Sequence, residues 1–386
     1  MTGVNERLRV ALIVGCLGQG GAEKQLIYIA RALLKAGVEV KVYSLTQGEY
    51  YEPALDAMSL QPIWIGKFAN PILRVFSLAN ALLHYRPHII HSTHFFTNLY
   101  AAIVARLWGS ISIGSLRNDA FLELKANEAW GRWLLRSPSV LIANSHAAKR
   151  NAVSLGIRND KVYILSNVID LVEFDEQIQT AQFKKGSNKG ICASAVARLV
   201  YEKRLDLFLE ALALAGRETS DLTGIVIGDG PEKTNLEAIA ADIGLLPESV
   251  LFLGRRNDVP SLLRQADMLI LTSDHEGSPN VLLEAMAAGV PVVTTPAGDA
   301  DVIVQDGVTG YVVAHDDVEE LAKRMVCLAK SHELRRRLGV AGRCRVESHY
   351  GVDGLASRLL SIYREIAEQL GNRELQRVLE LPHART

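Results

Sequence analysis

The sequence predicts an α/β protein built from two doubly wound, Rossmann-like domains that face each other across a cleft. At 386 residues the chain exceeds what one hydrophobic core ordinarily serves, so two domains are expected. Short runs of β-branched residues alternate with longer amphipathic stretches, which is typical of βα units around parallel sheets. This alternation falters after Asn167 and then starts again, which places the domain boundary near the middle of the chain.

The first series of βα units is expected to form a domain over residues 1–170. Three of its helices are predicted at Ala22–Lys35, Pro71–His84 and Ala147–Leu155. Its strands are predicted at Arg9–Val14, Glu39–Ser44, Ile63–Ile65, His88–His91, Ile111–Leu116, Val140–Ala143 and Val162–Leu165.

The second series is expected to form a domain over residues 188–351. It follows a polar segment, Leu171–Gly190, whose Lys-, Gly- and Ser-rich end is typical of an exposed linker. The chain is almost wholly helical from Val318, and we expect its last helices, within residues 352–386, to complete the first domain. Strands of the second domain are predicted at Ile191–Ala197, Gly224–Ile227, Val250–Leu253, Met268–Thr272, Val290–Thr294 and Gly310–Val313.

Composition excludes several classes of protein. Forty-two basic residues against 43 acidic ones leave a net charge of −1, so no bulk field attracts nucleic acid. No apolar run approaches the roughly 18 residues of a membrane-spanning helix. The four cysteines are scattered without CxxC spacing, and their apolar or helical settings suit reduced, buried thiols. We therefore expect a cytoplasmic protein without a zinc site.

Two glutamates stand eight residues apart in the most informative stretch of the sequence. Glu276 follows a predicted strand in a Gly/Ser/Pro turn, and Glu284 lies in the helix expected from Asn280 onward. Eight helical residues span on the order of 12 Å, whereas a glycosidase needs carboxylates roughly 5–9 Å apart. The pair better suits two hydroxyl-rich ends of one ligand, with a phosphate held between them by the helix amides. The alternative is an ordinary solvated pair of glutamates.

Two cations accompany this pair. Arg198 follows a strand of the same domain and Lys203 precedes the next helix, so both lie at the carboxyl edge of one sheet, where open α/β sheets bind ligands. A nucleoside diphosphate leaving group gains negative charge as its glycosidic bond breaks, and fixed cations stabilise that charge. The alternative for each cation is simple solvation at the surface.

These residues resemble glycosyltransferase family 4, which comprises retaining enzymes of the GT-B fold. Glu276 and Glu284 match the family's E-x7-E motif, Val196–Lys203 resembles its diphosphate-binding segment, and Gly18–Glu23 resembles its first glycine loop. The resemblance implies that residues 1–170 form the acceptor side and residues 188–351 bind the nucleotide-sugar. It implies catalytic roles for Glu276, Arg198, Lys203 and His94. It also implies donor contacts from Gly20, Gly21, Gly228, Arg255, Gly277, Ser278, Pro279, Asn280, Val281 and Glu284.

Two histidines compete for the place that one histidine takes in the cleft of many family members. His91 and His94 both follow a predicted strand of the first domain, and we slightly favour His94 as the one that reaches the donor sugar. The alternative is that both are polar loop residues without a catalytic role. One departure from the family is the turn Ala297-Gly298-Asp299, where many members have two glycines and then a glutamate.

The resemblance implies a retaining transferase that moves a sugar from a nucleotide-sugar to a glycan, lipid-linked or small-molecule acceptor, in polysaccharide or glycolipid synthesis. No cofactor and no metal are expected, because cations and helix amides already serve the diphosphate. The alternatives are a nucleotide-sugar epimerase or hydrolase, and a non-catalytic binding subunit. Peripheral contact with a membrane is a further hypothesis, based on the aromatic and basic segment Trp130–Arg136 and a second cluster of arginines at 335–345.

Overall fold

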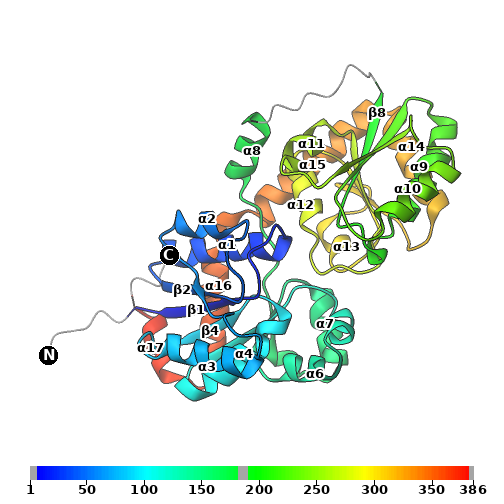
Figure 1. Cartoon of the computed structure of the whole chain (residues 1–386). Helices are drawn as coiled ribbons and strands as arrows, with labels where there is room; N and C mark the ends of the chain where they lie inside the picture. The colour runs from blue at the N-terminus through cyan, green and yellow to red at the C-terminus, as the bar shows by residue number, and fades with distance from the viewer. Residues whose placement is uncertain (1–6, 181–189, 382–386) are drawn as a thin grey trace. The chain divides into compact units, whose positions relative to one another are not determined.

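The computed structural model describes residues 7–180 and 190–381, which fold into two compact units (Figure 1). The chain passes from the first unit to the second between Val168 and Ile169, and it returns to the first between Gly351 and Val352. The second unit thus begins well before residue 188, the boundary expected from the sequence.

The first unit contains a seven-stranded parallel sheet in the order β3-β2-β1-β4-β5-β6-β7. The seven predicted strands are confirmed to within one residue at either end. They are β1 Arg9–Val14, β2 Glu39–Ser44, β3 Ile63–Trp64, β4 Ile89–Ser92, β5 Ile111–Leu116, β6 Val140–Ala143 and β7 Val162–Ile164. The helices between them are α1 Gly21–Lys35, α2 Glu52–Asp56, α3 Pro71–Leu82, α4 Asn98–Trp108, α5 Ala120–Ala126, α6 Glu128–Arg136 and α7 His146–Ser154.

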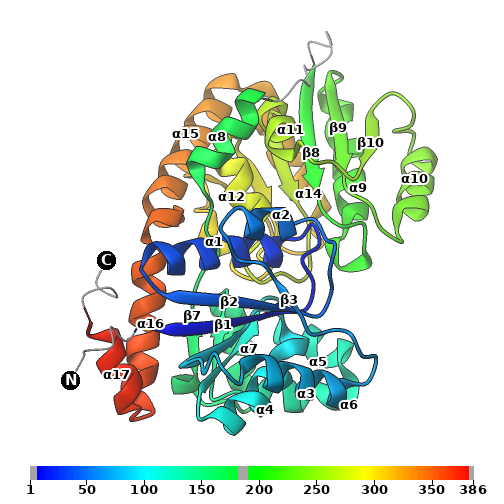
Figure 2. The same cartoon turned by 60° about the vertical axis from the view of Figure 1, so that its left-hand side comes forward.

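Two helices from the end of the chain complete this unit. They are α16 Leu355–Gln369 and α17 Arg373–Leu379, and α16 packs against α1 (Figure 2). Leu359, Tyr363 and Ile366 of α16 are fully buried in one hydrophobic cluster with Leu12 and Leu26. The first sheet is therefore covered on this face by residues that lie more than 300 positions away in the sequence.

The second unit contains a six-stranded parallel sheet in the order β10-β9-β8-β11-β12-β13. Its strands are β8 Ile191–Val196, β9 Leu222–Ile227, β10 Val250–Gly254, β11 Met268–Leu271, β12 Val292–Thr294 and β13 Gly310–Val312. Its helices are α8 Leu171–Thr180, α9 Leu205–Glu218, α10 Lys233–Asp242, α11 Val259–Gln265, α12 Asn280–Ala287, α13 Ala300–Ile303, α14 Val318–Lys330 and α15 His332–His349. The strand order reverses between β8 and β11, as it does between β1 and β4 in the first unit. Loops at such switch points form the ligand sites of open α/β sheets.

The prediction of a linker over Leu171–Gly190 was wrong for its first half. Helix α8 packs against α11 and α12, and Phe174 is only 2% exposed in the core of the second unit. The segment is polar overall, but Leu171, Phe174 and Ile178 recur at helical spacing and give it one apolar face. The lysine-rich part of the predicted linker, residues 181–189, lies outside the described residues.

The expectation of buried cysteines was also wrong for part of the set. All four are free thiols, but Cys327 and Cys344 are exposed on the outer faces of α14 and α15. Cys16 and Cys192 are partly buried. Helical position alone did not predict burial, because both exposed cysteines lie on the solvent side of amphipathic helices.

Candidate active site

The loops after β8 and β11 bring a lysine and a glutamate into direct contact within the second unit. Lys203 ends the 3₁₀ turn Tyr201–Lys203, and Glu276 lies between β11 and α12. The Lys203 Nζ donates to Glu276 Oε1 at 2.5 Å, with the two side chains only 18% and 14% exposed. Ser273 Oγ donates to the same oxygen at 2.8 Å. Among the described residues Oε2 receives no such hydrogen bond, so one carboxylate oxygen remains available to a ligand.

Backbone contacts hold these two loops together. The Thr272 hydroxyl donates to the Lys203 carbonyl at 3.0 Å, and the Asp274 amide donates to the Glu202 carbonyl at 3.0 Å. The next residue, Arg204, adopts a left-handed conformation with φ of 44° and ion-pairs with three aspartates. These contacts therefore fix the backbone of Lys203 relative to the loop that carries Glu276.

Glycines allow backbone segments to approach closely around this pair. Gly228, at φ of 144°, lies where an added Cβ would stand 1.8 Å from the Ala197 carbonyl oxygen. Gly298, at φ of 64°, lies where a Cβ would stand 2.2 Å from the Gly277 carbonyl oxygen. The Asp299 amide donates to that same oxygen at 2.9 Å. The Ala297–Asp299 turn thus packs against the backbone of the loop that carries Glu276. This role was not predicted from the sequence of the turn.

Helix α12 starts at Asn280, as predicted, directly after the Glu276 loop. Pro279 occupies its N-cap and offers no side-chain hydrogen bond, so the amides of the first turn are not capped in that way. Glu284 lies partly buried in the middle of α12. Arg198 and Arg255 are exposed beyond the ends of β8 and β10, and neither is placed in the hydrogen-bonded group of Lys203, Ser273 and Glu276.

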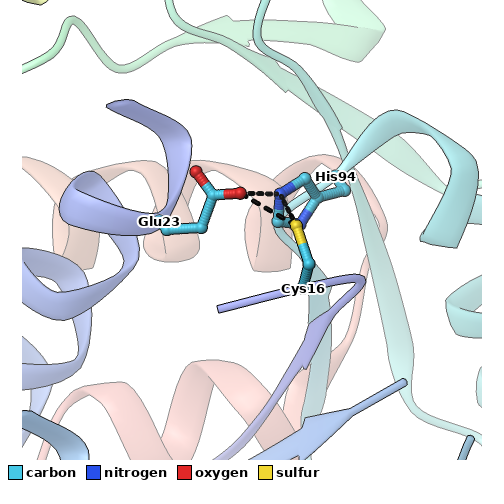
Figure 3. A group of neighbouring side chains, drawn as sticks. All are labelled: Cys16, Glu23 and His94. Carbon is cyan, nitrogen blue, oxygen red and sulfur yellow. Dashed lines mark hydrogen bonds and ion pairs between the residues drawn. The ribbon is translucent and has the colours of Figure 1, made fainter. Parts of the chain in front are cut away.

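In the first unit, the glycine loop between β1 and α1 meets the loop after β4 (Figure 3). His94 Nδ1 accepts from the Gly15 amide at 3.2 Å, so Nε2 carries the proton and faces Glu23 Oε1 at 3.3 Å. Cys16 Sγ donates to that same oxygen at 2.9 Å. A Cβ added at Gly20 would stand 2.2 Å from a Glu23 carboxylate oxygen, so a larger residue there would displace the Glu23 side chain.

These contacts set the charge of the group. Burial would raise the pKa of Glu23, but hydrogen bonds from His94 and Cys16 lower it below its ordinary value. Burial raises the pKa of Cys16 to about 12, and the adjacent Glu23 carboxylate adds to the rise. The group therefore holds a carboxylate and a protonated thiol at neutral pH. No role was predicted from the sequence for Glu23 or Cys16, although Glu23 lies only two residues after Gly21.

The two histidines have different environments. His91 is fully buried, and its Nδ1 lies 3.1 Å from the Tyr363 hydroxyl of α16. Burial, with a smaller effect of Arg117, lowers the pKa of His91 to about 3, so it is neutral. His94 lies at the glycine loop with its side chain 12% exposed. Of the two, His94 is the one that contacts the start of the glycine loop, at the Gly15 amide, and Glu23 in the first turn of α1.

The two segments proposed for membrane contact also differ. Trp130 and Trp133 are each 65% exposed on α6, while Leu134 and Leu135 face the core. The arginines at 335–345 largely hold the fold together: Arg335 contacts Asp267, Arg343 contacts Asp175, and Arg345 donates to the Val302 and Ile303 carbonyls. Arg336 and Arg337 of the same cluster are exposed, so the arginine surface stays a prediction beside the tryptophan face.

Two family models match the chain one after the other. The model described as Glycosyltransferase Family 4 matches residues 19–173. The model described as Glycosyl transferases group 1 matches residues 177–345.

Curated relatives include a transferase and a synthase. An alpha-1,4-N-acetyl-D-galactosaminyltransferase of Campylobacter jejuni, named for an undecaprenol-linked substrate, is 27% identical over 348 residues, or 86% of this chain and 91% of that enzyme. The N-acetyl-alpha-D-glucosaminyl L-malate synthase of Bacillus anthracis is 29% identical over 240 residues, or 61% of this chain and 62% of that enzyme. The match thus spans less than two thirds of the Bacillus relative.

Solved structures share the fold. Anabaena Alr3699/HepE in complex with UDP-glucose aligns with a TM-score of 0.78 at 21% identity, over 95% of this chain and 100% of that one. The lipopolysaccharide outer core galactosyltransferase WaaB aligns with a TM-score of 0.71 at 18% identity, over 94% and 100%. The two sheets are thus the two Rossmann-like domains of the GT-B fold. Because the family matches cover both of them, the chain belongs to glycosyltransferase family 4.

Proposed function

We propose that this protein is a retaining glycosyltransferase that moves a sugar from a nucleoside diphosphate sugar to a glycan, lipid-linked or small-molecule acceptor. The contact between Lys203 and Glu276 at the switch point of the second sheet carries this proposal. The names of the Campylobacter and Bacillus relatives support glycosyl transfer. The UDP-glucose complex of a structural neighbour supports a nucleotide-sugar donor. The role fits the synthesis of a cell-surface polysaccharide or glycolipid.

In this proposal the ligand replaces contacts that the protein now makes with itself. Glu276 accepts hydrogen bonds from donor-sugar hydroxyls through its available oxygen, and Glu284 accepts from the ribose. The donor diphosphate takes Lys203 as a partner, with Arg198 and the first amides of α12 as further sources of positive potential. These groups serve the leaving diphosphate without a metal. No positioned nucleophile is evident among residues 169–180 and 190–351, so we propose that the acceptor attacks from the face that the diphosphate leaves.

The test of this proposal is the Arg198→Ala, Lys203→Ala double variant. Loss of preorganised electrostatic stabilisation of the leaving group should lower turnover by about 10²–10³. Turnover is measured with the donor selected from UDP-, GDP- and ADP-sugars by thermal shift. Arg217→Ala, which removes a cation in the last turn of α9, is the matched control. Near wild-type turnover in the double variant would contradict the assignment.

Two finer points have separate tests. Retention is read by NMR from the anomeric configuration of the new linkage, and an inverted product would refute it. Metal-independent transfer is read from full activity after dialysis against EDTA. Rapid donor breakdown without acceptor would instead indicate a hydrolase.

We also propose that the exposed tryptophans of α6 contact a membrane surface near a lipid-linked acceptor. None of the helices within residues 7–180 and 190–381 is long and apolar enough to cross a bilayer. Trp130 and Trp133 lie one helical turn apart on a face that also carries Arg132 and Arg136, which is typical of interfacial helices. Flotation with vesicles containing anionic lipid should recover the wild type. A Trp130→Ser, Trp133→Ser variant should remain unbound, and equal recovery of both would contradict the role.

A further inference from the structure

Three different donor atoms meet where the glycine loop of the first unit passes the loop after β4 (Figure 3). Cys16 Sγ lies 2.9 Å from Glu23 Oε1 and 3.9 Å from His94 Nε2, and Glu23 Oε1 lies 3.3 Å from His94 Nε2. A thiol, a carboxylate and an imidazole so close together form the donor set that proteins offer to zinc and related ions.

We propose that Cys16, Glu23 and His94 form a binding site for a divalent transition-metal ion of the zinc class. The distances between the donors support it. With zinc–nitrogen and zinc–oxygen bonds of about 2.0–2.1 Å and a zinc–sulfur bond of about 2.3 Å, tetrahedral coordination separates donor atoms by roughly 3.3–3.6 Å. Of the three separations in the structure, the Glu23–His94 distance of 3.3 Å lies within that range, the Cys16–Glu23 distance of 2.9 Å lies below it and the Cys16–His94 distance of 3.9 Å lies above it. Shifts of a few tenths of an ångström would suffice to close the site.

The charges also balance. Coordination releases the Cys16 proton to solvent, so a thiolate and the Glu23 carboxylate neutralise a divalent ion beside a neutral imidazole. Three protein ligands leave a fourth position for water, as in open zinc sites. The Glu23 and His94 side chains are 11% and 12% exposed, which gives a small ion a way in from solvent.

One hydrogen bond opposes binding. The Gly15 amide donates to His94 Nδ1, which fixes the proton on Nε2, the atom that must bind the ion. Coordination therefore moves that proton to Nδ1, where the Thr93 hydroxyl at 3.4 Å becomes its acceptor and the Gly15 bond is lost. The net worth of one hydrogen bond is small beside the affinity of three protein ligands for zinc. Because binding costs the Gly15 hydrogen bond, we expect the site to bind zinc more weakly than a preformed zinc centre does. We also expect binding to be reversible.

We expect an ion in this position to inhibit transfer, and this consequence rests on the role at the donor sugar that the sequence predicts for His94. The ion would occupy Nε2 and fix the ring against Glu23. Zinc would thus act as a reversible inhibitor and not as a cofactor of the metal-independent transfer that we propose.

Cobalt is the probe for the site, because a cobalt–thiolate bond produces a charge-transfer band in the near ultraviolet. Titration of the full-length protein with Co²⁺ should give such a band that saturates at one equivalent and disappears when Zn²⁺ is added. Cys16→Ser should abolish the band, and Glu23→Gln should weaken binding at least tenfold. Cys344→Ser, which removes an exposed thiol, should leave the band unchanged. No band in the wild type, or an equal band in Cys16→Ser, would overturn the proposal.

An activity measurement separates the site from the function. Zn²⁺ should inhibit transfer by the wild type, EDTA should restore it, and Cys16→Ser should resist inhibition. A cobalt band without inhibition by zinc would support the metal site and refute the inhibitory role of the ion at His94. Absence of any transferase activity would refute the proposed function, while the cobalt titration would still report on the site.

Discussion

Replacing Gly298 with alanine should lower activity as well as stability. Gly298 lies at φ of 64°, and an added Cβ would stand 2.2 Å from the Gly277 carbonyl oxygen and 2.6 Å from that of Glu276. The left-handed backbone costs an alanine about 1–2 kcal/mol. Relief of the clash requires the two backbones to separate by roughly 1 Å, because real Cβ contacts seldom fall below 3.0 Å.

The loop that moves carries Glu276 and leads into α12. A displacement of about 1 Å in a catalytic group typically costs on the order of 10²-fold in rate. We therefore expect Gly298→Ala to lower kcat/KM by about 10²-fold, or about 2.7 kcal/mol of transition-state stabilisation. Steady-state kinetics measures the activity, and thermal unfolding measures the stability.

Gly307→Ala is the matched control. Gly307 has φ of 70°, and an added Cβ would find no atom within 4 Å. This variant should pay the same backbone cost of about 1–2 kcal/mol, but it should keep its activity. Near wild-type kcat/KM in Gly298→Ala, or equal losses of activity in the two variants, would refute the reasoning.

Two further predictions concern stability. Burial raises the pKa of Glu123 to about 7 from 4.5, so the folded state holds a proton that the unfolded state has released, and stability falls as pH rises from about 4.5 through 7. Glu123→Gln should therefore raise the free energy of unfolding by up to about 3 kcal/mol at pH 8 and have little effect at pH 5. The control Glu128→Gln, at an exposed position, should leave the free energy of unfolding unchanged at both pH values. A gain in urea unfolding that does not depend on pH would contradict the role of Glu123 protonation. The buried Gln25 amide donates to the Val168 carbonyl at 2.7 Å and accepts from its amide at 3.0 Å, so Gln25→Ala should cost about 2–4 kcal/mol by leaving two backbone groups unpaired. An unchanged melting temperature in Gln25→Ala would contradict that account.

Features encoded in short stretches of sequence were predicted well. The strands followed from runs of β-branched residues, and the start of α12 followed from the Gly/Ser/Pro turn before Asn280. The expectation that Lys203 and Glu276 share one sheet edge needed only the rule that parallel strands end on the same side. Their direct contact at 2.5 Å then came from the structure.

Features that depend on the meeting of distant segments were missed. Cys16 and Glu23 lie close in sequence, but His94 joins them only because β4 pairs with β1 in the sheet. The group has neither CxxC nor HxxxH spacing, so zinc-binding motifs could not predict it from the sequence. Helix α8 was not predicted because its apolar face is short. That face is recognised only once Phe174 is seen to be buried in the core of the second unit.

The return of the last helices to the first unit has a consequence for synthesis on the ribosome. Residues 169–351 emerge as one continuous stretch and can fold as soon as they are complete. The earlier unit must wait for α16, which supplies buried Leu359, Tyr363 and Ile366, so its apolar surface stays exposed until residues 355–369 have been made. We expect the order of folding to run against the order of translation, and nascent chains that stall before Val352 to depend on chaperones.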